Sequence, residues 1–258
     1  MICFQYDHRA PPQSGSRTIC LIISDTAGSG KSFLLNCLHY QLSHERDASE
    51  YCPVAAYTGV AAFNVNSLTL HSLFRLGLHG VDPELEPQQV EHLQECLRHL
   101  RYLFIDEKLM IGANTLSQIH NRLSVAFPAY ADIPFGGRSV ILIGDFAQLP
   151  PIGEIPMYAT APKFPKVQTL QGITLYAQFD RFVRLRTNMW QGSYDQAVFR
   201  DILLHAHNSD WLEDDWQELF NYRALCNLPR SVRNKFIHAT YLFPTNEAAS
   251  TFNRDNLE

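Results

Sequence analysis

The chain has 258 residues, of which 46% are hydrophobic and 18% are charged, and its formal net charge is −5. This composition excludes a disordered chain and provides enough apolar material for a large globular core. The net negative charge excludes a duplex-DNA binder with a basic surface throughout, but it leaves room for a local nucleic-acid groove.

The chain carries no sign of a membrane or secretory protein. Its apolar runs are shorter than the roughly 18 residues of a membrane span, and residues 1–17 lack a hydrophobic signal core. Its six cysteines form no C-x-x-C pair, which favours a reducing compartment. We expect an intracellular protein that does not contact a membrane, with residues 1–17 as an N-terminal tail.

The first strong pattern is a glycine-rich loop between a strand and a helix. Residues 19–23 (ICLII) predict a buried strand, and a helix is expected from Phe33 onward. The loop glycines would turn successive backbone N–H groups toward phosphate oxygens, and the helix would add the positive end of its dipole. The expected nucleotide-binding residues are Thr26, Ala27, Gly28, Ser29, Gly30, Lys31 and Ser32.

Within this loop, Lys31 would reach the β- and γ-phosphates of ATP, and Ser32 would bind Mg²⁺. Asp25 departs from the G-x-x-x-x-G-K-S/T pattern because it occupies the first glycine position. Aspartate adopts positive φ more readily than most residues, so the departure is tolerable. The same letters could also arise by chance in an ordinary loop.

Short strands then alternate with helical patterns, which predicts an α/β fold with a parallel sheet. Strands are expected at residues 54–57, 102–105 and 139–143. Helices are expected at residues 88–101, where apolar residues recur at helical spacing, and around residues 116–123. In such sheets ligands bind at the carboxyl ends of the strands, so polar residues there are functional candidates.

Two carboxylates, Asp106 and Glu107, follow the strand at 102–105 directly. Beside a phosphate loop, Asp106 would bind Mg²⁺ and Glu107 would deprotonate the attacking water. Gln148 follows the next strand, and its amide could contact a γ-phosphate and a water molecule. The alternatives are an exposed acidic turn and an ordinary proline turn.

The first domain is expected to span residues 18–165, because the proline-rich segment 154–166 predicts that the chain leaves it there. In residues 166–258 we expect a strand at 181–185, a helix at 196–205, a strand at 239–243 and a helix at 246–257. The acidic residues at 210 and 213–215 favour a solvated face over a recognition site.

Five motifs, taken in order, resemble the Pif (petite-integration-frequency) DNA helicases. They are TAGSGKS at 26–32, YTGVAAFNVNSLTLHSLFRL at 57–76, FIDEKLMIG at 104–112, PFGG at 134–137 and GDFAQLPPI at 144–152. Lys108 after the acidic pair is similar to the helitron-transposon branch. The motifs cover residues 21–152, and TLHSLF and GDFAQLPP are specific to this family among phosphate-loop proteins.

The resemblance implies a superfamily 1 motor with two RecA-like domains that moves 5′ to 3′ along single-stranded DNA while hydrolysing ATP. It implies a complete first domain here and an incomplete second one at residues 166–258. It makes Thr58 and His71 candidate DNA contacts, with Phe63 and Asn64 as further ones. Phe63 and Phe74 could equally belong to the core. The implied partner is single-stranded or forked DNA in the nucleus, in repair, recombination or telomere maintenance, and no obligate protein partner is implied.

Some residues depart from the family pattern. Leu109 stands where a serine is usual, and Trp190 stands where an arginine would reach the γ-phosphate. Motifs that follow in the family's second domain do not occur within these 258 residues. We therefore expect that this chain alone does not unwind a duplex. The alternatives to a helicase are a catalytically impaired module that binds ATP or single-stranded DNA, and a nucleotide kinase, against which the motif at 57–76 argues.

Overall fold

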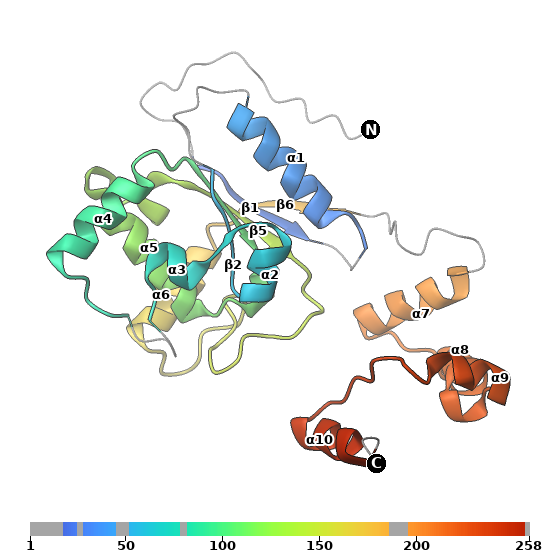
Figure 1. The fold of residues 1–258 in the computed structure, drawn as a ribbon. Helices are drawn as coiled ribbons and strands as arrows, with labels where there is room; N and C mark the ends of the chain where they lie inside the picture. The colour runs from blue at the N-terminus through green and yellow to red at the C-terminus, as the bar shows by residue number, and fades with distance from the viewer. Residues whose placement is uncertain (1–17, 25–27, 45–51, 78–81, 186–195, 256–258) are drawn as a thin grey trace. The chain divides into compact units, whose positions relative to one another are not determined.

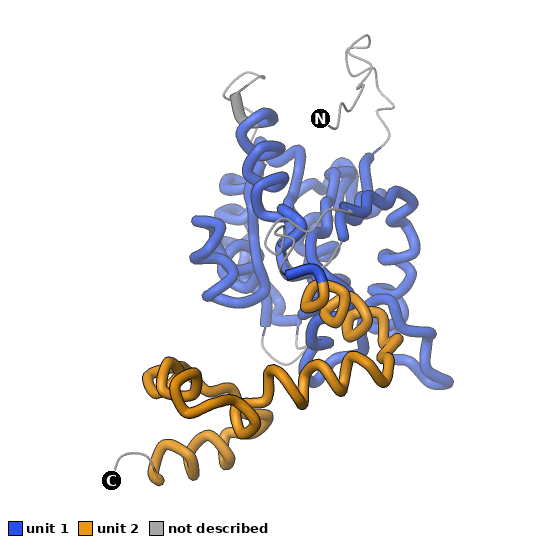
Figure 2. Tube along the Cα trace, turned by 90° about the vertical axis from the view of Figure 1, so that its right-hand side faces the viewer, with its two compact units in different colours: residues 1–197 blue, residues 198–258 orange. Residues whose placement is uncertain are grey.

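The computed structural model describes residues 18–24, 28–44, 52–77, 82–185 and 196–255. The chain divides into two compact units, residues 1–197 and residues 198–258 (Figure 2). The expected tail at residues 1–17, the loop residues Asp25, Thr26 and Ala27, and Trp190 lie outside the described residues.

Six strands form one sheet in the first unit, in the order β3-β2-β4-β5-β1-β6 (Figure 1). The strands are β1 (Cys20–Ser24), β2 (Val54–Ala56), β3 (Leu68–Thr69), β4 (Tyr102–Asp106), β5 (Ser139–Gly144) and β6 (Arg181–Arg184). Every neighbouring pair is parallel. The expected α/β fold with a parallel sheet is confirmed, as are the strands expected around residues 19–23, 54–57, 102–105, 139–143 and 181–185.

Helices cover both faces of this sheet. They are α1 (Lys31–His44), α2 (Gly59–Asn64), α3 (Leu70–Phe74), α4 (Pro87–Leu97), α5 (Ala113–Ala126) and α6 (Val167–Tyr176), with the 3₁₀ turns η2 (Lys108–Met110), η3 (Pro128–Tyr130) and η4 (Pro134–Gly137). Figure 1 shows α1 on one side of the sheet and α4, α5 and α6 on the other. The helices expected at 88–101 and around 116–123 correspond to α4 and α5.

The strands alternate their side chains between two apolar cores. In β4, Leu103 and Ile105 pack with the α4 and α5 side, whereas Phe104 packs with Leu35 of α1. The same alternation holds in β5. A strand buried on both faces reads as a continuous apolar run, which is why these strands could be predicted from the sequence.

The first unit extends beyond residue 165, where its boundary was expected. Strand β6 pairs in parallel with β1, with Leu21 opposite Arg181 and Ser24 opposite Arg184. Helix α6 packs against α5. A proline-rich composition indicates a loop but does not indicate where the chain goes next, so the sheet partner of residues 181–184 was not readable from it.

The segment 154–166 does not leave the first unit, contrary to expectation. Its Met157 is fully buried in the core beside α5. Pro156 forms an antiparallel bridge with Gly112, and the Ala113 N–H donates to the Ile155 carbonyl oxygen at 2.8 Å. The prolines therefore shape a segment that crosses the surface and packs one side chain into the core.

Gly172 lets α6 approach α5 closely, which yields a stability prediction. A Cβ atom at this position would overlap the backbone carbonyl of Ala113, which cannot rotate away. We expect Gly172→Ala to lower the free energy of unfolding by about 2–3 kcal/mol through overpacking, measured by urea denaturation. Gly59→Ala is the matched control, because a Cβ at Gly59 meets nothing within 4 Å. Equal stabilities for both variants would contradict this packing.

The regular elements among the described residues that follow β6 are all helices or helical turns. They are α7 (Ala197–Asn208), α8 (Glu213–Glu218), the π-helix η6 (Leu219–Arg223), η7 (Leu225–Asn227), α9 (Arg230–Arg233), η8 (Asn234–Phe236) and α10 (Asn246–Asp255). Helices were expected at 196–205 and from residue 246, and α7 and α10 confirm them. That this unit is part of a second RecA-like domain stays a prediction.

One expectation for the second unit is wrong, and another is right for three residues of four: Asp210, Glu213 and Asp214 are exposed, as a solvated face requires. Residues 239–243 form no strand, because the described part of this unit offers no neighbouring strand, and Leu242 is 92% exposed. The fourth residue, Asp215, is buried instead: its carboxylate accepts from the Leu212 N–H at 2.9 Å and bonds His205 Nδ1 at 2.9 Å. Among all described helices, none has both the length and the apolar character to cross a bilayer.

Candidate nucleotide and DNA site

The expected site residues gather at one edge of the sheet. Strands β1, β4 and β5 are neighbours and parallel, and Ser24 of β1 lies opposite Gly144 of β5. The loops that follow these strands therefore leave the sheet at the same edge. They carry the glycine-rich loop, the Asp106–Glu107 pair and the segment with Gln148.

The glycine-rich loop has the backbone that a phosphate cradle needs. Gly28 has φ 80° and Gly30 has φ 90°, a region that L-residues rarely adopt. Lys31 is the first residue of α1 and Ser32 the second, and the Leu34 N–H donates to the Gly30 carbonyl oxygen at 2.9 Å. The N-terminus of a 14-residue helix thus follows the loop, and it favours an anion there.

Ser29 gives an independent indication that this loop accepts a polar ligand. Its Oγ atom is buried and has no hydrogen-bond partner among the described residues. Buried hydroxyls are normally satisfied, so an orphaned one inside a loop of positive-φ glycines fits contact with a phosphate oxygen. The described part of the loop, Gly28 to Ser32, therefore fits the phosphates of a nucleoside triphosphate.

The acidic pair is partly buried beside this loop. The Glu107 N–H donates to Asp106 Oδ1 at 2.9 Å. Burial raises the pKa of Asp106, while the Glu107 N–H and the Lys31 ammonium oppose the rise. Burial and the Asp106 carboxylate raise the pKa of Glu107, which Lys31 also counteracts. The Lys31 charge thus lowers the pKa of both carboxylates, as expected of groups that share one site.

Glu107 itself has a left-handed backbone, with φ 55° and ψ 46°. A non-glycine residue rarely adopts this conformation, and where it does so at a site the surrounding structure must hold it. The Met110 N–H donates to the Glu107 carbonyl oxygen at 3.1 Å, and this bond closes the η2 turn that follows. The two carboxylates thus extend from different backbone conformations, Asp106 from the end of β4 and Glu107 from the left-handed turn.

Lys108 also lies at this edge, although the sequence indicated it only as a similarity to the helitron-transposon branch. Its side chain is fully buried, and Nζ donates to Ser24 Oγ at 3.1 Å and to the Gly144 carbonyl oxygen. The ammonium also lies 4.0 Å from the centre of the Phe146 ring. Burial lowers the pKa of Lys108 to about 7, against the attraction of Asp145.

The loop after β5 separates two polar residues. Asp145 is buried, and its Oδ1 accepts from the Ala147 N–H at 3.0 Å, whereas Gln148 is exposed. Asp145 was not among the expected site residues, although its place directly after a buried strand could have indicated it. The exposure of Gln148 leaves its amide accessible to a ligand at this edge.

The candidate DNA contacts lie on the neighbouring segment after β2. Thr58 caps α2, and its Oγ1 accepts from the Ala61 N–H at 3.2 Å, so the hydroxyl proton can still be donated. His71 of α3 packs edge-on against Tyr57 at 5.4 Å between ring centres. Phe63 is 84% exposed and Phe74 is 0% exposed, which settles that only Phe74 belongs to the core.

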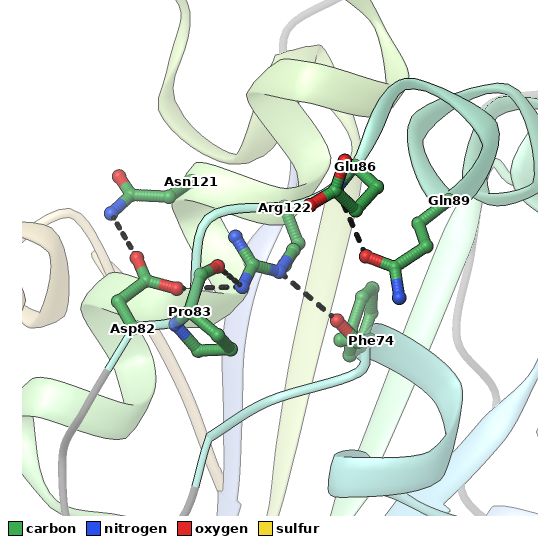
Figure 3. A network of polar contacts seen from close by, with 7 residues as sticks. All are labelled: Phe74, Asp82, Pro83, Glu86, Gln89, Asn121 and Arg122. Atoms are coloured by element: carbon green, nitrogen blue, oxygen red, sulfur yellow. Dashed lines mark hydrogen bonds and ion pairs between the residues drawn. The ribbon is translucent and has the colours of Figure 1, made fainter.

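Arg122 of α5 holds the end of α3 in place, another contact that the sequence did not reveal (Figure 3). Its Nε donates to the Phe74 carbonyl oxygen at 3.2 Å, and Nη2 donates to that of Pro83 at 2.7 Å. Nη2 also lies 2.8 Å from Asp82 Oδ1, and Asn121 donates to the other carboxylate oxygen at 3.1 Å. The short helix that carries His71 is thereby tied to the core.

Comparisons with known proteins agree with this arrangement. The model of the PIF1-like helicase family matches residues 14–210. The ATP-dependent DNA helicase Pif1 of Bdellovibrio bacteriovorus is 38% identical over 135 residues, which are 51% of this chain and 29% of that protein. The ATP-dependent DNA helicase Pif1 of Campylobacter jejuni is 27% identical over 237 residues, 83% of this chain and 49% of that protein.

A solved structure is also similar. The crystal structure of Pif1 helicase from Bacteroides in complex with ADP-AlF3 and single-stranded DNA has 26% sequence identity and a TM-score of 0.65. The match covers 95% of this chain and 54% of that one. The chain thus spans about half or less of the length of these relatives.

Proposed function

The chain belongs to the PIF1-like helicase family, and we propose that it binds and hydrolyses ATP to drive 5′ to 3′ movement along single-stranded DNA. The observation that carries this proposal is the convergence of Gly28, Gly30 and Lys31 with the Asp106–Glu107 pair at one edge of the sheet. A phosphate cradle beside two carboxylates of distinct geometry is what ATP hydrolysis requires.

The proposed roles follow from position. Residues 26–32 would hold the phosphates, with Lys31 contacting the β- and γ-phosphates, and Ser32 and Asp106 would hold Mg²⁺ directly or through water. Glu107 would accept the proton of the attacking water. Gln148, exposed at the same edge, would contact the γ-phosphate and the water.

The proposed partner is single-stranded or forked DNA, held through Thr58 and His71. Nuclear location and a part in repair, recombination or telomere maintenance belong to the same proposal. They rest on the family, since the residues described here carry the motor chemistry and not the choice of pathway.

The test is ATP turnover by this chain with and without an oligo(dT) strand. We expect turnover that rises when the strand is added. The second candidate is a module that binds ATP or single-stranded DNA without turnover, and the observation in its favour is Trp190 at the arginine position. Nucleotide binding without hydrolysis would support that candidate, and the absence of nucleotide binding would contradict both.

His71 provides a prediction for the DNA contact. Losing one hydrogen bond to a charged group costs about 1.5–3 kcal/mol, so we expect His71→Ala to weaken oligo(dT) binding about 10- to 100-fold, measured by fluorescence anisotropy at low salt. His99→Ala is the matched control, because His99 is exposed and precedes β4, at the opposite edge of the sheet. Equal affinities for the two variants would remove His71 from the DNA site.

A further inference from the structure

Lys108 lies at the end of β4 and contacts the ends of β1 and β5, so it links the three strand ends that carry the candidate site. Its Nζ reaches Ser24 Oγ, the last residue of β1 before the glycine-rich loop. It also reaches the carbonyl oxygen of Gly144, the last residue of β5, and the ring of Phe146 in the Gln148 loop. Lys108 itself follows the acidic pair at the end of β4.

We propose that Lys108 is a positioning residue, whose buried amino group holds the Glu107 turn and the Gln148 loop in register with the phosphate loop. The proposal rests on the proposed ATP hydrolysis. In this proposal Lys108 does not contact the nucleotide, because its side chain is fully buried and its donors are directed at protein atoms.

The contacts explain why a lysine suits this place. A carbonyl oxygen and a hydroxyl oxygen both accept hydrogen bonds, and lysine Nζ offers rotatable donors to both from one point. The aromatic face attracts the charged form of the same group. The attraction of Asp145, Asp106 and Glu107 offsets part of the cost of burial. An apolar side chain of the same length would fill the space but would attract none of these groups.

The backbone around Glu107 shows what the Lys108 side chain would hold in place. Glu107 has a left-handed conformation, and Lys108 is the next residue, so fixing the Lys108 side chain restricts the turn that aims the Glu107 carboxylate. Gly144 permits this close approach, since a Cβ there would lie 3.0 Å from the Lys108 backbone nitrogen. The ends of β4 and β5 therefore approach closely at Lys108 and Gly144.

The experiment compares Lys108→Met with wild type in two independent measurements. We expect ATP turnover to fall about 10- to 100-fold, the scale on which small misplacements of reacting groups act, with the affinity for a fluorescent ATP analogue changed less than about threefold. Without nucleotide, we expect faster amide hydrogen exchange at residues 106–111 and 144–149 and unchanged exchange at residues 20–23. Lys166→Met, an exposed lysine before α6, is the matched control.

The outcomes separate the two proposals. Unchanged exchange at 106–111 and 144–149 would overturn the positioning role, and so would faster exchange throughout the sheet, which marks a merely structural lysine. If wild type hydrolyses no ATP, the proposed function fails, while the exchange comparison still decides the role of Lys108. If Lys108→Met does not fold, Ser24→Ala removes one acceptor only, and it must show the same local exchange pattern to support the proposal.

Discussion

Replacing Lys31 with alanine is expected to abolish ATP binding. Lys31 begins α1 directly after the positive-φ Gly30, and its charge acts on both Asp106 and Glu107. Without it, the phosphates would meet two carboxylates with no ammonium at the loop. Hydrogen bonds to charged groups contribute about 1.5–3 kcal/mol each, so losing two of them weakens binding about 10²- to 10⁴-fold.

Titration with a fluorescent ATP analogue measures this effect. Lys163→Ala is the control, because it removes an exposed lysine and leaves the loop intact. Alanine is well tolerated at the first turn of a helix, so a loss of binding would not come from unfolding. Equal affinity of wild type and Lys31→Ala would show that the glycine-rich loop does not bind the triphosphate.

Glu107→Gln is expected to stop ATP turnover while leaving nucleotide bound. The amide keeps the shape of the side chain but cannot accept a proton, and general-base catalysis contributes about 10² to 10⁴ in rate. Glu107 is the candidate because burial and its neighbour Asp106 raise its pKa, which brings it closer to the working pH of a base. Single-turnover hydrolysis and analogue affinity, measured on the same protein, separate the two effects.

Glu95→Gln is the control for this change, since Glu95 is exposed and forms a surface ion pair with Arg98 at 2.6 Å. Exposed pairs contribute little, so no change in turnover is expected there. Full turnover by Glu107→Gln would assign the base elsewhere. Asp145, which is buried and acts electrostatically on Glu107, would then be the residue to test.

Much of the first unit could be predicted because its signals are local. The buried strands read as apolar runs, and α4 and α5 read as helical spacing of leucines and isoleucines. The glycine-rich loop and the acidic pair were found because their chemistry needs adjacent residues in a fixed order. The family resemblance, confirmed by the family model over residues 14–210, rests on the same local strings. The helitron branch stays a prediction.

Positions that depend on distant neighbours could not be predicted in this way. The prediction of a strand at 239–243 was wrong because an apolar run forms a strand only where another strand is available to pair with it. Phe63 and Phe74 are the same residue type in one motif, and only the packing of α3 against the core places Phe74 inside and leaves Phe63 exposed.

The sequence by itself determined the parallel α/β fold and the positions of the glycine-rich loop and the acidic pair. Apolar periodicity, glycines and adjacent carboxylates are local properties of the chain, and they need no distant neighbour. Only the tertiary structure decided that β6 joins the first sheet, that Met157 returns to the core and that Lys108 lies buried among three strand ends. Each of these depends on which segments meet in space. From the sequence, a lysine after two carboxylates is expected on the surface, and only the contacts with the ends of β1 and β5 show that it is buried.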